Sequence, residues 1–366
     1  MIIDGHAYCF PARHESAGFD SVKDRWDEFQ RELSVHHQPA WRIRDRAPAG
    51  NDTLIDPGTG DLRDVKFSVH RNRFSWNYQN EDYTKQYYPP MLYRMECPPE
   101  LLIAEMDYAG IDLSVLHTSS QLGRLNSYLS EAGQAYPDRI RWLISLDEAR
   151  IPGESEAALA EIDRWAKFPE ACGYQFHPKF YYLGGHAESW DSGPMRVFWD
   201  GFASMGLTAY FTPIGARPAT AFTSVEGDTY IEELNTLKRW MDRYPDITVV
   251  LTHGFPWRSF KEGNGIVLPE TIWKIFEAPQ CHLQLLFPIQ IGNLWEYPWI
   301  EVMPTIQECV ERIGADRLIY GTDMPMVARF CTYKQTLDQY QRHCSFLSDA
   351  DRKSITGGTM ARILGL

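Results

Sequence analysis

The chain has 366 residues, of which 44% are hydrophobic and 23% charged, so it can bury a sizeable core. Its formal net charge of −13 argues against non-specific binding to nucleic acid or to an anionic membrane, because both require a basic surface. No long uncharged apolar run suggests a membrane span, and the N-terminus lacks the features of a signal peptide. Seven scattered cysteines without a CxxC pair favour reduced thiols. We therefore expect a cytoplasmic globular protein.

Strand and helix patterns alternate along most of the chain. The expected strands lie at residues 2–3, 113–116, 140–146, 173–176, 207–212, 247–252, 281–287 and 318–320. The expected helices lie at residues 98–110, 124–136, 156–168, 194–205, 228–243, 268–277, 302–313, 333–345 and 349–364. Eight apolar strands that alternate with helices predict one α/β domain over residues 1–366, a (β/α)₈ TIM barrel. An open doubly wound sheet is the alternative, weakened because no Gly-rich dinucleotide motif follows the first strand.

A polar and aromatic stretch between residues 15 and 95 interrupts this alternation. The sequence DPGTG at residues 56–60 predicts a tight turn, and KFSVHRNRFSW just after it is typical of a hairpin arm. Because the stretch follows the first strand, a barrel would carry it at its catalytic face. We therefore interpret residues 15–95 as an inserted cap over the site. A surface excursion or an oligomer contact is the alternative.

Four polar residues fall at the carboxyl ends of predicted strands, the face where barrel enzymes build their sites. They are His6, His177, His253 and Asp323. A single histidine is more often structural than functional, but three histidines and one aspartate at equivalent points of four strands are unexpected by chance. Imidazole and carboxylate groups suit Zn²⁺, Mn²⁺ or Fe²⁺, and a free coordination position would permit catalysis. A helix N-cap is the alternative role of Asp323.

The same residues lie in short motifs whose order and spacing resemble the amidohydrolase superfamily. The family's opening Asp-x-His-x-His is similar to residues 4–8 (DGHAY), and its His-Pro and His-Gly pairs match His177-Pro178 and His253-Gly254. Its Gly-[Ser/Thr]-Asp-x-Pro motif matches residues 321–325 (GTDMP), and its closing helix resembles residues 355–366. Within the superfamily the pattern looks like the branch of aminocarboxymuconate-semialdehyde decarboxylase. The resemblance covers residues 1–14 and about 97–366.

The resemblance implies one divalent metal ion, with Zn²⁺ or Mn²⁺ as the expected cofactor. By this resemblance His6, His177 and Asp323 hold the metal, His253 stands beside it as general acid or base, and Asp323 can also accept a proton. Tyr8 departs from the family, because it occupies the place of the second histidine of the first motif. A phenol is a poor ligand unless it ionises. Three roles are therefore open for Tyr8: a phenolate ligand, a hydrogen-bond partner of metal-bound water, or the mark of a site without metal.

The resemblance also implies a metal-dependent, non-oxidative decarboxylase that cleaves a carbon–carbon bond of an aromatic or unsaturated carboxylic acid. A hydrolase of an amide, ester, lactone or carbon–carbon bond is the first alternative, because metal-activated water can attack a carbonyl instead. A metal-free barrel with a binding role is the second, and Tyr8 is the residue that suggests it. The expected partner is a small carboxylated, aromatic substrate, and a homodimer is expected by analogy.

Several weaker candidates lie near these positions. Lys179 and Arg258 follow two of the strand-end histidines closely enough to meet an anionic substrate, although a solvated surface position is the more common role. His117 ends the second predicted strand and could line the pocket, whereas His282 lies within a strand and is expected in the core. The remaining candidates, for the pocket wall or for binding a carboxylate, are Gln290, Asn293, Trp295, Arg73 and Arg94.

Overall fold

The computed structural model describes residues 1–36, 38–70, 72–213 and 227–366. An eight-stranded parallel sheet lies at its centre, and the strand order in space follows the order in the chain. The strands are β1 (Ile3–Ala7), β7 (Leu113–Leu116), β8 (Ile140–Ile144), β9 (Ala171–Phe176), β10 (Ala209–Phe211), β11 (Val249–Leu251), β14 (Cys281–Leu285) and β15 (Leu318–Tyr320). Each lies at an expected apolar run, because strands covered on both faces are apolar almost throughout.

The sheet closes on itself between its first and last strands. Ala7 of β1 forms a parallel bridge with Met324, just beyond β15, and the amide of Tyr8 donates to the carbonyl of Met324 over 2.7 Å. The amide of Asp323 donates to the carbonyl of His6 over 2.9 Å. A closed parallel sheet with helices between its strands is a (β/α)₈ barrel. This closure confirms the expected fold and excludes the open doubly wound sheet.

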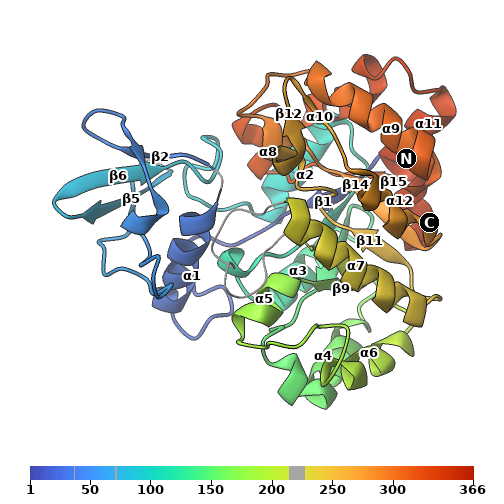
Figure 1. The fold of residues 1–366 in the computed structure, drawn as a ribbon, viewed down its shortest axis with the longest axis horizontal. Coiled ribbons are helices and arrows are strands. Elements are labelled where there is room, and N and C mark those ends of the chain that lie inside the picture. Colours follow the sequence, from blue (N-terminus) through green and yellow to red (C-terminus); the bar gives the residue numbers. More distant parts are fainter. Residues whose placement is uncertain (37, 71, 214–226) are drawn as a thin grey trace.

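Helices surround the barrel strands (Figure 1). They are α2 (Pro99–Ala109), α3 (Asn126–Ala135), α4 (Ser155–Trp165), α5 (Pro178–Leu183), α6 (Met195–Ala203), α7 (Gly227–Arg243), α8 (Pro288–Ile291), α9 (Met303–Ile313), α10 (Tyr333–Asp338), α11 (Asp349–Lys353) and α12 (Thr359–Leu364). No helix of the described residues has the length and apolar character needed to cross a membrane.

Three expected helices differ in detail from the structure. The helix expected at residues 268–277 is a 3₁₀ helix over Glu270–Glu277, and its buried side chains recur every three residues, which suits the three-residue 3₁₀ turn. The last two expected helices are interrupted by π-helical turns at Gln339–His343 and Ser354–Gly358. At the second of these, a Cβ on Gly357 would lie 2.2 Å from the carbonyl oxygen of Met1, so only glycine permits this contact with the start of the chain.

Side chains inside the barrel change from apolar to polar toward the carboxyl ends of the strands. An apolar cluster fills the amino-terminal half, with Met360 of α12 packed into it. Its other buried members are Ile3, Leu113, Val115, Leu143, Tyr210, Val250 and Ile319. Gln175 of β9 and Gln284 of β14 are fully buried among otherwise apolar strands. The polar half of the interior is therefore where a functional site is to be sought.

The segment between β1 and α2 contains one long helix and a small antiparallel sheet. The helix is α1 (Val22–Val35), and the sheet has the order β3-β2-β6-β5-β4. Its strands are β2 (Ala40–Arg42), β3 (Pro48–Ala49), β4 (Ser68–His70), β5 (Arg73–Tyr78) and β6 (Glu81–Lys85). The expected hairpin arm is therefore the pair β4–β5. The sheet extends to one side of the barrel, and α1 lies between the two (Figure 1).

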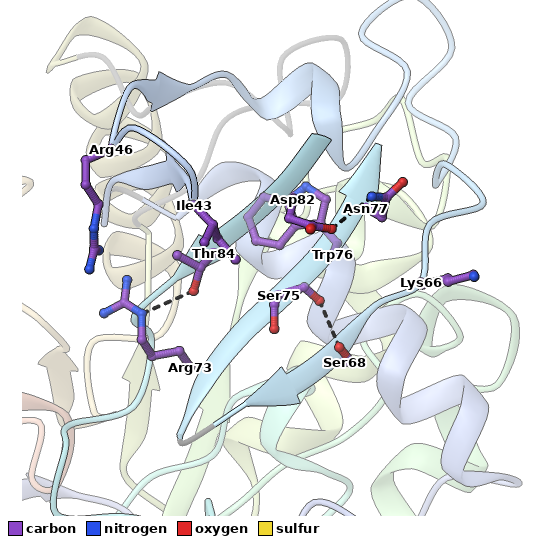
Figure 2. A pocket seen from close by; sticks show the side chains of 10 residues that line it. All are labelled: Ile43, Arg46, Lys66, Ser68, Arg73, Ser75, Trp76, Asn77, Asp82 and Thr84. Carbon is purple, nitrogen blue, oxygen red and sulfur yellow. Dashed lines mark hydrogen bonds between the residues drawn. The ribbon is translucent and has the colours of Figure 1, made fainter. Parts of the chain in front are cut away.

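The two faces of this small sheet differ in character. Phe74 of β5 packs on α1 through Phe29, with ring centroids 5.3 Å apart, and stacks on Phe67 at 5.2 Å. The opposite face is polar and hollowed into a groove of about 500 Å³, where Arg73 donates to Thr84 (Figure 2). All residues that line this groove belong to the insert, so the strand-end residues of the barrel must form a separate site.

Candidate metal centre

His6 is fully buried at the end of β1, and its two ring nitrogens have different partners. Nδ1 lies 2.9 Å from the amide oxygen of Gln284, whose amide nitrogen donates to the carbonyl of Gly5 over 2.8 Å. Since this oxygen can only accept, Nδ1 carries the proton. The lone pair of His6 therefore lies on Nε2, the tautomer required of a metal ligand.

His253 and Asp323 bring their side chains to the same nitrogen from β11 and β15. Oδ1 of Asp323 lies 3.5 Å from Nε2 of His6 and 3.4 Å from Nε2 of His253. Both residues adopt left-handed backbone conformations, with φ of 60° for His253 and 66° for Asp323. Such strained turns are characteristic of functional positions. The backbone amide of His253 also donates to Gln284, so one glutamine positions two members of the group.

The donor set fits a divalent cation. The ligand atoms of His6, His253 and Asp323 all lie within 4.8 Å of one another. Two ligands each about 2.1 Å from one ion are roughly 3.0–3.4 Å apart at octahedral or tetrahedral angles, close to the observed separations. Nitrogen and carboxylate ligands of this kind suit Zn²⁺ and Mn²⁺.

The charge states of these residues also favour a cation. Burial lowers the pKa of His6 well below its usual value, and the neighbouring rings of His117 and His253 lower it further. Burial alone would raise the pKa of Asp323, but the hydrogen bond from His253 and the charges of His253 and His6 outweigh it and lower that pKa. A neutral imidazole and an ionised carboxylate are therefore available at neutral pH.

Tyr8 places its hydroxyl in this group. The oxygen lies 2.8 Å from Nε2 of His6, and the ring is almost fully buried. Burial raises the pKa of Tyr8 well above its usual value, and the charge of Asp323 raises it further. Without a cation, Tyr8 is consequently a neutral phenol that donates to His6.

His177 lies beside the group in a different set of contacts. Its Nδ1 is 3.3 Å from Oε1 of Glu148, which also accepts from its backbone amide over 3.0 Å. Its Nε2 is 3.2 Å from the amide nitrogen of Gln175. Among the described residues, the three-membered group does not include His177. Its charge lowers the pKa of His117, so it belongs to the same neighbourhood, and its assignment as a ligand stays a prediction.

Two buried glutamines and one histidine complete the polar end of the barrel. His117 stacks on His6 with ring centroids 3.6 Å apart and planes 8° apart, and its Nε2 lies 2.9 Å from the carbonyl of Gly5. Gln175 accepts from the amide of Thr118 and approaches His177. Neither Gln175 nor Gln284 belongs to the sequence motifs, so the sequence analysis did not identify them. The available signal was a lone amide side chain within an apolar strand, since a buried amide must be hydrogen-bonded.

The insert reaches this end of the barrel through its helix and its last residues. Glu32 of α1 pairs with Lys179, which follows His177, with 3.1 Å between the charged atoms. Gln121 donates to the hydroxyl of Tyr87 over 2.5 Å, and Arg329 donates to the carbonyl of Tyr87 over 2.5 Å. Lys179 is thus paired with a carboxylate of the insert rather than exposed.

The other weak candidates have ordinary structural contacts. Arg258 donates to Asn293 over 3.0 Å, and Trp295 donates to Asn264. Gln290 donates to the carbonyl of Phe255, and His282 contacts backbone carbonyls within the sheet, as expected of a core residue. Arg94 is largely exposed, and Arg73 lines the groove of the insert.

Comparison with known proteins bears on the family and the fold of the chain. The chain matches the family model described as amidohydrolase over residues 3–366, which confirms the resemblance of its motifs. No curated protein sequence is significantly similar to it. Several solved structures share the fold at low sequence identity. Three of them are described here because they are named as different enzymes.

The first is 5-carboxyvanillate decarboxylase from Novosphingobium aromaticivorans, with manganese and 4-hydroxy-3-methoxy-5-nitrobenzoic acid, at 17% identity and a TM-score of 0.57, covering 100% of this chain and 96% of its own. The second is dihydroxybenzoic acid decarboxylase from a Polaromonas species, with manganese and 2-nitroresorcinol. It is 20% identical, with a TM-score of 0.53, and the match covers 72% of this chain and 85% of the other. The third is a probable 2-pyrone-4,6-dicarboxylic acid hydrolase from Acinetobacter baumannii, with citric acid. It is 15% identical, with a TM-score of 0.52, and the match covers 74% of this chain and 90% of the other.

Proposed function

Because the chain belongs to the amidohydrolase family and is an enzyme of that family, we propose that it is a metal-dependent, non-oxidative decarboxylase of an aromatic carboxylic acid. The convergence of His6, His253 and Asp323 at the carboxyl ends of the strands carries this proposal. Two of the similar structures are named as decarboxylases of aromatic acids, and both contain manganese. The proposed cofactor is accordingly Zn²⁺ or Mn²⁺.

The residues can divide the reaction between them. By family resemblance, His177 would join His6 and Asp323 in holding a divalent ion, which leaves His253, the other member of the observed group, free to act as an acid. The ion would polarise a substrate oxygen and offset its charge. Protonated His253 delivers its Nε2 proton to the ring carbon that bears the carboxylate, and Asp323 at 3.4 Å stabilises the charged imidazole before transfer. The carbon–carbon bond then breaks, its electron pair restores the aromatic ring, and CO₂ leaves. Solvent returns the proton to His253, so one proton is consumed for each CO₂ released.

The insert has a place in this proposal as a cap within one domain of residues 1–366. The contacts of Glu32 with Lys179 and of Tyr87 with Gln121 and Arg329 attach it to the loops beyond the strands. A cap over those loops would limit the access of water, which strengthens the electrostatic interactions inside the site. The outer antiparallel sheet lies on the side of α1 away from the barrel (Figure 1).

A hydrolase is the second candidate. One of the similar structures is named as a probable hydrolase, and activation of water would use the same histidines and aspartate. The two reactions differ in what enters the product. Decarboxylation adds a solvent proton to carbon, whereas hydrolysis adds a solvent oxygen.

The test is an assay of the metal-loaded protein with 2,6-dihydroxybenzoate and 5-carboxyvanillate as first substrates. We expect CO₂ release that depends on Zn²⁺ or Mn²⁺, and a product made in heavy water that carries deuterium at the former carboxyl carbon. Asp323→Asn should abolish both the activity and the bound metal, whereas His343→Gln, at a histidine that contacts Tyr297, should change neither. Product that contains labelled oxygen from water, without CO₂, would establish the hydrolase instead.

A further inference from the structure

Arg329 is a partly buried cation at the rim of the metal centre, and its Nε atom is fully buried. It ends the short 3₁₀ helix Met326–Arg329 that follows Asp323, and the amide of Met326 donates to the carbonyl of Asp323 over 2.7 Å. We propose that Arg329 binds a carboxylate of the substrate beside the metal centre, an inference that rests on the proposed function because it supposes an acidic substrate. The residue lies outside the motifs that indicated the site.

The guanidinium has one edge in use and one edge free. Its Nη1 donates to the carbonyl of Tyr87 over 2.5 Å. Its Nε is buried and has no hydrogen-bond partner among the described residues, and Nη2 donates to none of them. Carboxylates bind arginine through two parallel hydrogen bonds, and Nε with Nη2 forms one of the edges suited to this geometry. The free edge therefore matches a carboxylate.

The charge of Arg329 has no carboxylate within ion-pairing distance in the described part of the chain. Burial lowers its pKa to about 10, so the group is still charged at neutral pH. Withdrawing even part of a cation from water without a close carboxylate is costly, and proteins rarely retain such a group without a use. The charge of Asp323, from beyond ion-pairing distance, raises the pKa of Arg329.

The surroundings of the free edge favour an aromatic acid. The guanidinium carbon lies 5.8 Å from the ring centroid of Tyr87 and 5.5 Å from that of Phe330. Burial raises the pKa of Tyr87 and of Tyr8, and the charge of Asp323 raises both further. Both rings therefore lie near the metal centre. A benzoate-like ligand would pair its carboxylate with Arg329 and place its ring among these side chains. Tyr87 belongs to the insert, so barrel and insert would form this subsite together.

The competing explanation is structural. Arg329 could serve only to attach the insert to the barrel through the carbonyl of Tyr87. Binding separates the two explanations if a charged ligand is compared with a neutral one of the same shape. Benzoate and benzamide differ in charge but hardly in size, and their ratio of dissociation constants within one variant does not depend on how much of that variant is folded.

The experiment is calorimetric titration of the metal-loaded protein with benzoate and with benzamide, for wild type, Arg329→Gln and Arg329→Lys. Loss of a charge-assisted bidentate pair should weaken benzoate binding about 10- to 100-fold in Arg329→Gln and leave benzamide binding nearly unchanged. Arg329→Lys should recover part of the preference for benzoate over benzamide, because lysine keeps the charge but cannot form the bidentate pair. Arg342→Gln removes an exposed arginine of the same charge and is the matched control.

Equal loss of affinity for both ligands in Arg329→Gln, an unchanged benzoate affinity, or no benzoate binding by wild type would overturn the inference. The result is separable from the proposed function. Release of CO₂ by a wild type whose benzoate affinity is insensitive to Arg329 would leave the decarboxylase standing without this subsite. Benzoate binding that requires Arg329, in a protein that releases no CO₂ from any acid, would leave the subsite standing without the decarboxylase.

Discussion

The hydroxyl of Tyr8 lies 2.8 Å from Nε2 of His6, the nitrogen that a metal ion would require. Gln284 fixes the proton of His6 on Nδ1, so Nε2 accepts the phenolic proton while no cation is bound. A cation on Nε2 must displace that hydrogen bond. Tyr8 is therefore coupled to metal binding, either as a ligand or as a group that has to turn its proton toward another acceptor.

Replacing Tyr8 decides between these roles. In the metal-free site, burial and the charge of Asp323 raise the pKa of Tyr8 and keep it a neutral phenol. We expect Tyr8→Phe to keep about one metal ion per chain, with affinity changed by less than about 100-fold, as for outer-sphere partners. Tyr8→His should bind the metal more tightly. Elemental analysis after dialysis measures both, and a tyrosinate absorption band that appears when metal is added to wild type would mean that the phenol ligates.

His177 provides the second prediction. Its Nε2 faces the amide nitrogen of Gln175, whereas a ligand needs that nitrogen free. If metal binding draws His177 away from Gln175, His177→Ala should lose the metal as completely as His6→Ala does. Gln175→Leu should keep it, because the competing donor is gone. Full metal occupancy in His177→Ala, measured together with His6→Ala, would remove His177 from the ligand set and leave His253 as the third ligand.

The third prediction concerns His253. As a proton donor and not a ligand, it should be needed for turnover and dispensable for metal binding. His253→Gln is expected to lower kcat by about 10²- to 10⁴-fold, the usual contribution of general acid–base catalysis, with the metal content of wild type. Parallel loss of metal and activity would assign the residue to the metal. Steady-state kinetics with elemental analysis of the same preparations distinguishes the two outcomes.

Lys85 makes stability depend on pH. Its ammonium donates to the carbonyls of Leu33 and His36 at the end of α1, and burial lowers its pKa from 10.5 to about 7. Between these two values the unfolded chain holds a proton that the folded chain has released, so the free energy of unfolding rises with pH. Below about 7 both states are protonated, and this contribution no longer varies with pH.

Lys85→Met should therefore remove a slope of up to about 1.4 kcal/mol per pH unit from this window. Urea unfolding at several pH values between the two pKa values measures it. The exposed Lys167 gives a matched variant, Lys167→Met, that should keep the slope of wild type. An unchanged slope in Lys85→Met would mean that the two carbonyls stabilise the ammonium enough to restore its ordinary pKa.

The sequence was sufficient for the barrel because each of its strands is an apolar run and a helical pattern separates each strand from the next. The positions of His6, His253 and Asp323 could also be predicted, since the carboxyl ends of parallel strands converge wherever the sheet closes. Residues 268–277 show the limit of such patterns. Their apolar spacing suits an α-helix and a 3₁₀ helix almost equally, and the folded chain has the 3₁₀ form.

What only the tertiary structure decided concerns contacts between residues far apart in the chain. Gln284 reaches His6 and fixes its proton, yet the two are separated by 278 positions and no local pattern connects them. Likewise, Arg329 meets Tyr87 only because the insert folds back onto the barrel. The amino-acid sequence by itself determined which residues stand at the strand ends, because side-chain periodicity is local. Their partners, protonation states and free hydrogen-bonding edges depend on burial and neighbours, which exist only once the chain has folded.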